Sequence, residues 1–283
     1  MKNLTHDRIK SIVKPRQKSS HKGDHGHSLL IVGNQGKMGA AVIASRACLR
    51  TGTGLLTVSV PKSERLILQI AIPEAMLIMR EKHENKVNNF TAIGIGCGIG
   101  TDKKSTQILF HLLAECSMPM VLDADALNII ASNKHLVEKI LPNTILTPHP
   151  KEFDRLFGVH KNIKERMKTA IVKAKEYKVI IVLKDHETLV THNGDAFLNS
   201  TGNAGLAKGG SGDALTGIII ALLSQGYIPF DAAKIGVYLH GLAADLALEK
   251  QSMESMLITD VIEYLGQAFK LISGSLDSIK SFD

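Results

Sequence analysis

The chain has 283 residues, of which 44 % are hydrophobic and 22 % are charged. That balance supplies enough apolar surface for a large core and excludes a wholly disordered protein. Membrane spans are not expected either, because no uncharged apolar run reaches the roughly 18–20 residues that a span needs. The nearest run, residues 214–230, is interrupted by Gly217, Gly226 and Pro229. No apolar signal segment follows the first basic residues, so we expect a soluble, cytoplasmic protein.

The net charge of +7 is concentrated at the N-terminus. Residues 1–22 hold seven Lys and Arg against the single acid Asp7, which accounts for six of the seven net charges. We predict that this basic segment is solvated or attracts anionic ligands, and that residues 23–283 form one domain. Nucleic-acid binding is not expected, because Trp is absent and aromatic residues make up only 4 % of the chain. The widely spaced cysteines predict reduced structural thiols and no zinc site: Cys48, Cys97 and Cys116.

Short runs of Val, Ile and Leu alternate with helix-length segments along the chain, which predicts an α/β fold. Such runs are typical of strands buried on both faces of a mostly parallel sheet, with helices covering each face. The expected strands are 29–33, 55–60, 92–96, 120–122, 144–146 and 179–183. The expected helices are 39–51, 103–115, 161–175, 213–224 and 231–248. Segments 187–191 and 196–198 flank Asn193-Gly194, which predicts a small antiparallel hairpin at one edge, because Asn-Gly favours a type I′ turn.

The first expected strand leads into a glycine-rich turn, from Gly33 to Gly39, and then into a helix. A turn of this kind often binds a ligand. Its spacing differs from the G-x-G-x-x-G of dinucleotide-binding folds, and no acidic residue ends the next expected strand. The turn therefore does not by itself predict a redox cofactor site. Glycine-rich or polar segments also follow three later strands: residues 96–100, 123–128 and 147–152.

The segments 123–128 and 147–152 contain carboxylates and a histidine, and the sequence allows more than one role for most of these side chains. Asp123 and Asp125 could help to place Mg²⁺ through water, since hard cations favour carboxylates, or Asp125 could only cap a helix that starts at the next residue. His149 stands between two prolines that fix its backbone, which favours a functional role. Glu152 could act near phosphates, but we expect it to cap the helix that begins beside it.

The most informative segment is the loop of residues 199–213, which runs directly into a strongly apolar helix pattern. Gly209, Gly210 and Gly212 allow main-chain N–H groups to approach an anion closely. The helix that follows adds unpaired N–H donors and the positive end of its dipole. The pattern predicts a phosphate-binding loop. It is not a Walker A loop, because Lys208 precedes the glycines and no Gly-Lys-Ser/Thr follows.

Asp213 needs a separate explanation, because a carboxylate repels phosphate. It could supply an acidic charge at the helix N-terminus, or it could be the base that removes a proton from an attacking hydroxyl. We favour the base, since a capping role would not explain why three of the four residues before Asp213 are glycine.

The sequence Gly-Gly-Ser-Gly-Asp at 209–213, opening a helix, resembles the anion hole and catalytic Asp of the ribokinase-like kinases. Together with other segments in the same order, it makes the chain from about His21 to the last helix resemble the ADP/ATP-dependent NAD(P)H-hydrate dehydratases, also called the YjeF C-terminal domain family. The other segments are residues 21–27, 34–41, 96–100, 123–128 and 147–152. The resemblance implies a ribokinase-like fold.

The resemblance also implies a repair reaction. Hydrated NADH or NADPH (NADHX or NADPHX) would be dehydrated with ADP or ATP and Mg²⁺, because phosphorylation of the ring hydroxyl turns a poor leaving group into phosphate. Many relatives carry an epimerase domain for which this chain has no room, so a separate epimerase partner is implied. The family further suggests a homotetramer.

Carried over onto this sequence, the resemblance gives roles to individual residues. Asp213 would be the catalytic base, with an anion hole formed by the amides of Gly210, Ser211 and Gly212. Besides Asp213, the implied substrate contacts are Ala41, Gly100 and His149. The implied nucleotide contacts are Lys184, Asp185, His186, Glu187, Thr188 and Gly212. Asp185 stands where the family usually has glycine, which puts nucleotide affinity and preference in question.

Two other functions are compatible with parts of the sequence. The loop of residues 209–213 alone would permit a ribokinase-like kinase for a small alcohol such as a vitamin precursor, although residues 21–27 and the His149 segment argue against it. A nucleotide-binding sensor that has lost catalysis is opposed by the intact loop but left open by Asp185.

Overall fold

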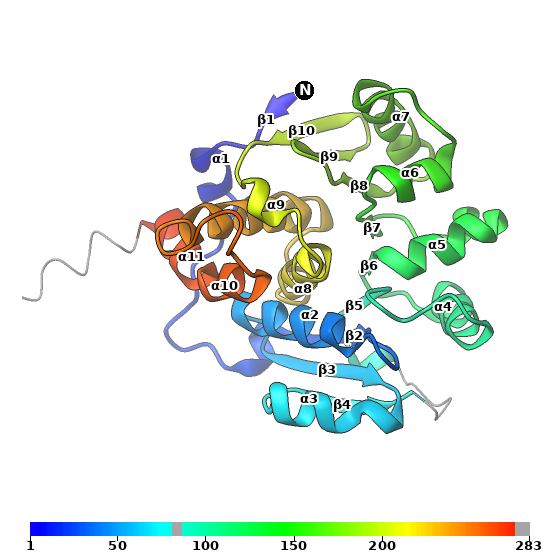
Figure 1. Ribbon diagram of the computed structural model, residues 1–283, viewed down its shortest axis with the longest axis horizontal. Coiled ribbons are helices and arrows are strands. Elements are labelled where there is room, and N and C mark those ends of the chain that lie inside the picture. Colours follow the sequence, from blue (N-terminus) through cyan, green and yellow to red (C-terminus); the bar gives the residue numbers. More distant parts are fainter. Residues whose placement is uncertain (81–86, 275–283) are drawn as a thin grey trace, which may run out of the picture.

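The structure, a computed structural model, describes residues 1–80 and 87–274 (Figure 1). The described strands form a ten-stranded sheet in the order β1-β10-β9-β8-β7-β6-β5-β2-β3-β4. Their bounds are β1 Lys2–Asn3, β2 His27–Ile31, β3 Leu55–Val60, β4 Met76–Met79, β5 Ala92–Ile95, β6 Met120–Leu122, β7 Ile145–Leu146, β8 Ile180–Leu183, β9 Thr188–His192 and β10 Asp195–Asn199. The strands from β8 to β4 in this order pair in parallel, whereas β9 is antiparallel to β8 and β10. The mostly parallel sheet with an antiparallel hairpin is therefore confirmed.

Helices cover both faces of this sheet (Figure 1). Helices α2, α8 and α9 lie over one face, with α10 and α11 outside them, and α4, α5, α6 and α7 lie over the other. The bounds are α1 His6–Lys10, α2 Met38–Thr51, α3 Arg65–Ala71, α4 Lys103–Glu115, α5 Ala124–Ser132, α6 Pro150–Phe157, α7 Ile163–Glu176, α8 Ser211–Ser224, α9 Pro229–Ala247, α10 Ile258–Glu263 and α11 Leu265–Ser273. Among the described helices none has the length and apolarity to cross a membrane.

Helix α8 is the central helix of the molecule. It packs against α2, α9 and the strands β2, β5 and β6, and every residue from 214 to 224 is buried. A helix surrounded in this way has no face left for charged residues, which explains why its sequence is apolar all round. Its position fixes the N-terminus of α8 against the carboxyl ends of the parallel strands.

Close packing between α2 and α8 depends on Gly217. A Cβ atom at this position would lie 2.2 Å from the carbonyl oxygen of Ala44 in α2, so the two helices would have to separate. We therefore expect Gly217→Ala to destabilise the fold by about 1–3 kcal/mol, the usual effect of overpacking a rigid core. Urea unfolding checks this, with Gly266→Ala as the control. Nothing lies within 4 Å of a Cβ at that glycine of α11, so the control should be neutral or slightly more stable.

The basic N-terminal segment is packed onto the domain, which contradicts the first of its two expected properties, that it is solvated, and leaves the attraction of anionic ligands open. Strand β1 pairs in parallel with β10, and Ile9 of α1 is fully buried in the core under α9 and α11. The backbone N–H of Lys14 donates to the hydroxyl of Tyr227 at 2.8 Å. Apolar residues placed between the lysines anchor this segment. Because β1 takes the end of the sheet, the predicted hairpin lies one strand in from that edge.

Candidate active site

The loop before α8 places glycine residues and unpaired backbone N–H groups at the N-terminus of the helix. Gly210 precedes the helix with φ +95°, and a Cβ there would lie 2.6 Å from the Cδ1 atom of Ile43, so both its backbone and its surroundings favour glycine. The helix starts at Ser211, two residues earlier than predicted. The first helical bond runs from Ala214 N–H to the Gly210 carbonyl, and Ser211 N–H donates to Lys208 at 3.4 Å. Within the described chain, the N–H groups of Gly210 and Gly212, two of the three predicted for the anion hole, have no partner, and neither has that of Asp213 in the first turn.

Asp213 lies in the first turn of α8, next to a second buried carboxylate and a thiol. Burial raises the pKa of Asp213, and Asp123 adds to the increase, while a hydrogen bond with Cys97 and the charge of Lys184 act in the opposite direction. The pKa of the Cys97 thiol is itself raised by burial and by the two carboxylates, so this side chain stays a neutral donor. The Asp213 carboxylate is therefore partly shielded from water. A raised pKa makes it a stronger proton acceptor, as general-base catalysis requires.

Lys184 places a positive charge at the N-terminal end of α8. Its Nζ atom lies 2.9 Å from Oδ1 of Asp123, and a Cβ added at Gly212 would lie only 3.1 Å from the same Nζ. Burial acts to lower the pKa of Lys184, but Asp123 and Glu152 outweigh it and the pKa is raised, so the amine is charged. Free amides, a helix dipole and an ammonium group therefore converge at Gly212, which suits a phosphate.

The residues present do not fit a magnesium ion held directly by the protein. Oδ1 of Asp123 accepts from Ala124 N–H at 2.8 Å as well as from Lys184, and Oδ2 accepts from Thr216 at 2.9 Å. Asp125 accepts from Gly100 N–H at 2.8 Å and lies 3.7 Å from Lys37. No group of three or more His, Cys, Asp or Glu side chains suited to a metal occurs in the described ranges.

The same contacts correct the expected helix cap. Helix α5 starts at Ala124, two residues before the start at Ala126 considered from the sequence, and it is capped by Asp123. Asp125 lies inside its first turn and instead holds the backbone of Gly100.

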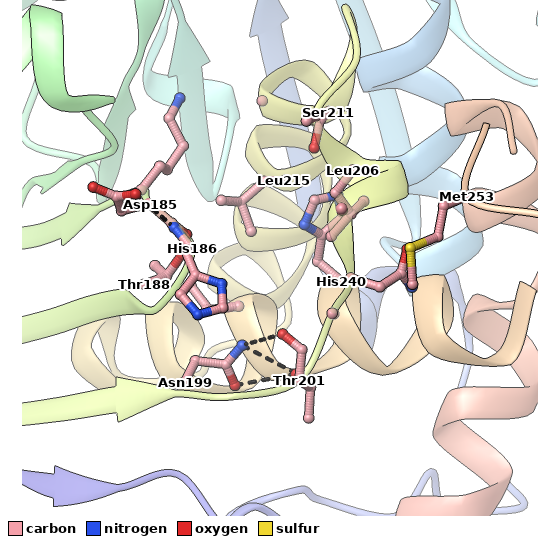
Figure 2. A pocket seen from close by; sticks show the side chains of 18 residues that line it. Asp185, His186, Thr188, Asn199, Thr201, Leu206, Ser211, Leu215, His240 and Met253 are labelled. Carbon is pink, nitrogen blue, oxygen red and sulfur yellow. Dashed lines mark hydrogen bonds between the residues drawn. The ribbon is translucent and has the colours of Figure 1, made fainter. Parts of the chain in front are cut away.

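A cavity of about 710 Å³ opens beside the first turn of α8 (Figure 2). Most of the predicted nucleotide contacts line it: Lys184, Asp185, His186, Thr188 and Gly212. Glu187 is exposed and is not among the lining residues. Asp213 does not line this cavity either, but follows Gly212 at its end. The volume is in the range of cavities that hold a nucleotide-sized ligand.

Asp185 does not need the backbone freedom of glycine. It is absent from the described non-glycine residues with positive φ, and its carboxylate accepts a hydrogen bond from His186 N–H at 2.7 Å. The replacement of the family's usual glycine by Asp185 therefore causes no backbone strain. Its remaining consequence is a negative charge at the mouth of the cavity.

His149 caps helix α6. Its Nδ1 atom accepts from Lys151 and Glu152 N–H at 3.1 and 3.3 Å, and Glu152 Oε2 accepts from His149 N–H at 2.9 Å. This capping box confirms the expected role of Glu152. Burial lowers the pKa of His149 against the effect of Glu152, so the imidazole is neutral, with Nε2 3.3 Å from Glu152 Oε1.

The other two predicted substrate contacts are Gly100, which follows β5, and Ala41, which lies in α2. Gly100 has φ +81° and is partly exposed, whereas Ala41 is fully buried in α2. Contacts of Ala41, Gly100 and His149 with a substrate stay predictions from the resemblance.

Several residues of the site were missed from the sequence. Thr216 follows Asp213 by three residues, a spacing that could have indicated a shared helix face, and its hydroxyl donates to Asp123. Asn199 and Thr201 are hydrogen-bonded to each other at the cavity wall (Figure 2). His240 of α9 also lines the cavity, and burial together with Lys184 lowers its pKa to about 4. Asn199 and Thr201 belong to the loop of residues 199–213 but were given no role of their own, and no local pattern marked His240.

Comparison with known proteins identifies the family. Residues 28–267 match the family model described as NAD(P)H-hydrate dehydratase. An ADP-dependent (S)-NAD(P)H-hydrate dehydratase of Neisseria meningitidis is 36 % identical over 90 % of this chain and 88 % of its own length. The ADP/ATP-dependent NAD(P)H-hydrate dehydratase of Bacillus subtilis, co-crystallised with ATP and Mg²⁺, superposes with TM-score 0.85 at 31 % identity, covering 96 % of this chain and 98 % of that one.

Longer relatives also match. The bifunctional NAD(P)H-hydrate repair enzyme of Moorella thermoacetica is 32 % identical over 98 % of this chain, but the chain spans only about half, 55 %, of that relative. A hydroxyethylthiazole kinase of Pyrococcus horikoshii, at 16 % identity and TM-score 0.63, shares the fold alone. With a matched model over most of its length and relatives above 30 % identity, the chain belongs to the NAD(P)H-hydrate dehydratase family, within the ribokinase-like fold.

Proposed function

We propose that this chain converts hydrated NADH or NADPH back to the reduced dinucleotide at the expense of ADP or ATP. The observation that carries the proposal is the convergence of unpaired α8 amides, the Lys184 ammonium and the Asp213 carboxylate at the N-terminal end of α8, beside the cavity. The amides and the ammonium stabilise the negative charge of a phosphoryl group in transfer. The carboxylate accepts the proton of the hydroxyl that attacks this group.

The reaction balances in two steps. The ring hydroxyl attacks the terminal phosphorus of the nucleotide while Asp213 accepts its proton; the new P–O bond forms, the bond to the leaving phosphate oxygen breaks, and AMP or ADP departs. The C–O bond of the phosphorylated ring then breaks, phosphate leaves with the bonding electrons, and the neighbouring ring carbon loses a proton, which restores the double bond. Amides at Gly212 and Asp213 and the charge of Lys184 stabilise the moving phosphoryl group.

Further parts of the proposal rest on the relatives. The nucleotide would occupy the cavity at residues 184–188, and any Mg²⁺ would arrive on the nucleotide phosphates, because Asp123 is already saturated. Longer bifunctional relatives support a separate epimerase that supplies the correct substrate isomer. We also propose a cytoplasmic homotetramer, for which light scattering after size exclusion is the test.

The assay is direct. The protein is mixed with hydrated NADH, Mg²⁺ and either ADP or ATP, and the near-ultraviolet absorbance of reduced nicotinamide is followed. We expect absorbance to return only when a nucleotide is present. No return with either nucleotide would refute the dehydratase, and phosphorylation of a thiazole or pyrimidine alcohol instead would establish the kinase.

The pH dependence should report Asp213. A base must be unprotonated, so kcat/KM should be high above the pKa of Asp213 and fall as the pH drops through it. Because burial and Asp123 raise that pKa, the acid limb should lie above the ordinary carboxyl value of about 3.9. Cys97→Ala removes a hydrogen bond that lowers the pKa, and should move the limb to higher pH. If the acid limb of kcat/KM stayed at the same pH in Cys97→Ala, the titrating group would not be Asp213.

A further inference from the structure

A second concave site lies at the opposite end of α2 and α8 from the candidate active site. This cavity, of about 600 Å³, is bounded by the N-terminal segment, the C-terminal ends of α2 and α8, and helix α11. The candidate active site lies at the N-terminal end of α8, a helix of 14 residues and so about 21 Å long. No described residue lines both cavities. They are therefore separate sites.

The second cavity is strongly basic. The cations that line it are Lys10, Lys14, Arg16, Arg50 and Lys270. Of these only Arg50 pairs with a carboxylate in the described ranges, at 2.7 Å from Glu263. Among the residues that the structure describes, no acidic one lines the cavity. Like charges gathered in a concave surface strengthen one another's field, so the cavity attracts anions.

Part of this charge has a structural explanation, and part does not. Lys14 Nζ donates to the Gly226 carbonyl at 3.3 Å, and Arg16 donates to the Gly52 carbonyl, so both side chains satisfy carbonyls at the C-terminal ends of α8 and α2. These bonds hold the N-terminal segment in place without neutralising its charge. Lys10 and Lys270 have no hydrogen-bonded or ionic partner among the described residues.

The remaining wall is apolar and aromatic. Tyr227 is 8 % exposed, with Lys14 Nζ 5.1 Å from its ring centre, and Val13, Phe269 and Ile272 complete this side. An aromatic wall beside unpaired cations can hold a flat ring next to a negatively charged chain.

We propose that this cavity, defined by Lys10, Lys14, Arg16, Arg50 and Lys270, binds a small anion that carries two or more phosphate charges. The basic N-terminal segment thereby has a function of its own, because it folds back to supply three of the five cations. A single phosphate would satisfy fewer of them, and the concave shape favours a compact ligand over an extended surface. The shared chemistry is a phosphate chain, either free or as part of a nucleotide.

The test uses inorganic tripolyphosphate, titrated calorimetrically into the full chain at low salt. We expect Lys10→Gln/Lys270→Gln to lower the tripolyphosphate affinity of one binding event about tenfold or more, because the two unpaired cations of the second cavity are removed. Lys10→Arg/Lys270→Arg should keep wild-type affinity. Lys134→Gln/Lys139→Gln is the matched control: it removes the same charge from exposed residues elsewhere and should change the affinity less than twofold.

Further arms separate the two phosphate sources. Tighter binding of ATP than of tripolyphosphate at this site, lost in Phe269→Ala, would support the proposal and assign the site to nucleotides. Equal binding would support it and assign the site to the phosphate chain alone. An unchanged isotherm in Lys10→Gln/Lys270→Gln, or an equal loss in the Lys134/Lys139 control, would overturn it. None of these outcomes depends on dehydration of a hydrated dinucleotide.

Discussion

Asp213→Asn is expected to lower turnover by about three to four orders of magnitude, which is the combined effect of removing a general base and its positioning. The side chain is not needed to cap the helix, because Gly210 precedes α8 and no side chain provides a capping hydrogen bond there. Asparagine has nearly the same shape, and its neighbour Cys97 can still donate to Asp123. The fold and nucleotide affinity should therefore be retained, as measured by unfolding and by calorimetry with ADP.

Asp231→Asn is the matched control for this variant. Asp231 occupies the corresponding place in the first turn of α9, where it pairs with Lys234 at 2.7 Å, away from the cavity beside α8. Its replacement should leave turnover close to wild type. If Asp213→Asn turned over at the same rate as Asp231→Asn, the carboxylate in α8 would be a helix charge and not the base.

Lys184→Met is expected to have the second large effect, on both stability and nucleotide binding. The Asp123 side chain is only 2 % exposed, so removing its partner leaves a buried carboxylate without its cation. Breaking such a pair costs about 3–5 kcal/mol. The variant should also bind ADP much more weakly, because the ammonium beside Gly212 is lost. Urea unfolding and calorimetry with ADP measure the two losses.

Two comparisons separate these effects. Lys173→Met breaks the more exposed pair with Glu176, which is 2.8 Å long, and should cost less than about 1 kcal/mol. Lys184→Met/Asp123→Asn removes the stranded charge as well, so it should recover part of the stability but none of the nucleotide affinity. Equal destabilisation by Lys173→Met and Lys184→Met, or full recovery of ADP binding in the double variant, would contradict the role given to Lys184.

The central part of the fold could be predicted from the sequence because its signals are local. The expected strand 55–60 and helix 103–115 coincide with β3 and α4, since buried parallel strands are short apolar runs and α4 begins directly after a capping Asp102. The Asn193-Gly194 turn likewise joins β9 to β10 as predicted, with both residues at positive φ.

Other parts depend on contacts between distant segments, which no local pattern records. Strand β1 has only two residues and exists because β10 offers a free edge. Strand β4 carries the exposed Met76 at the opposite edge, and α3 exposes Leu66 and Ile70, so neither has the pattern of a buried element.

The candidate site shows the same division. Gly210, Gly212 and Asp213 are adjacent in sequence, so their geometry at the start of α8 was predictable. The contacts of Asp123 with Lys184 and Thr216 join residues 61 and 93 positions apart, which only the sheet order brings together.

The fate of the ring oxygen tests the central claim most directly. Hydrated NADH prepared in ¹⁸O-labelled water carries the label in its ring hydroxyl, and it is treated with the protein and ADP or ATP in unlabelled water. If that hydroxyl attacks phosphorus and leaves as phosphate, one ¹⁸O atom should appear in each inorganic phosphate released, as mass spectrometry would show. Unlabelled phosphate, formed while the dinucleotide is dehydrated, would mean that the hydroxyl leaves as water and is never phosphorylated.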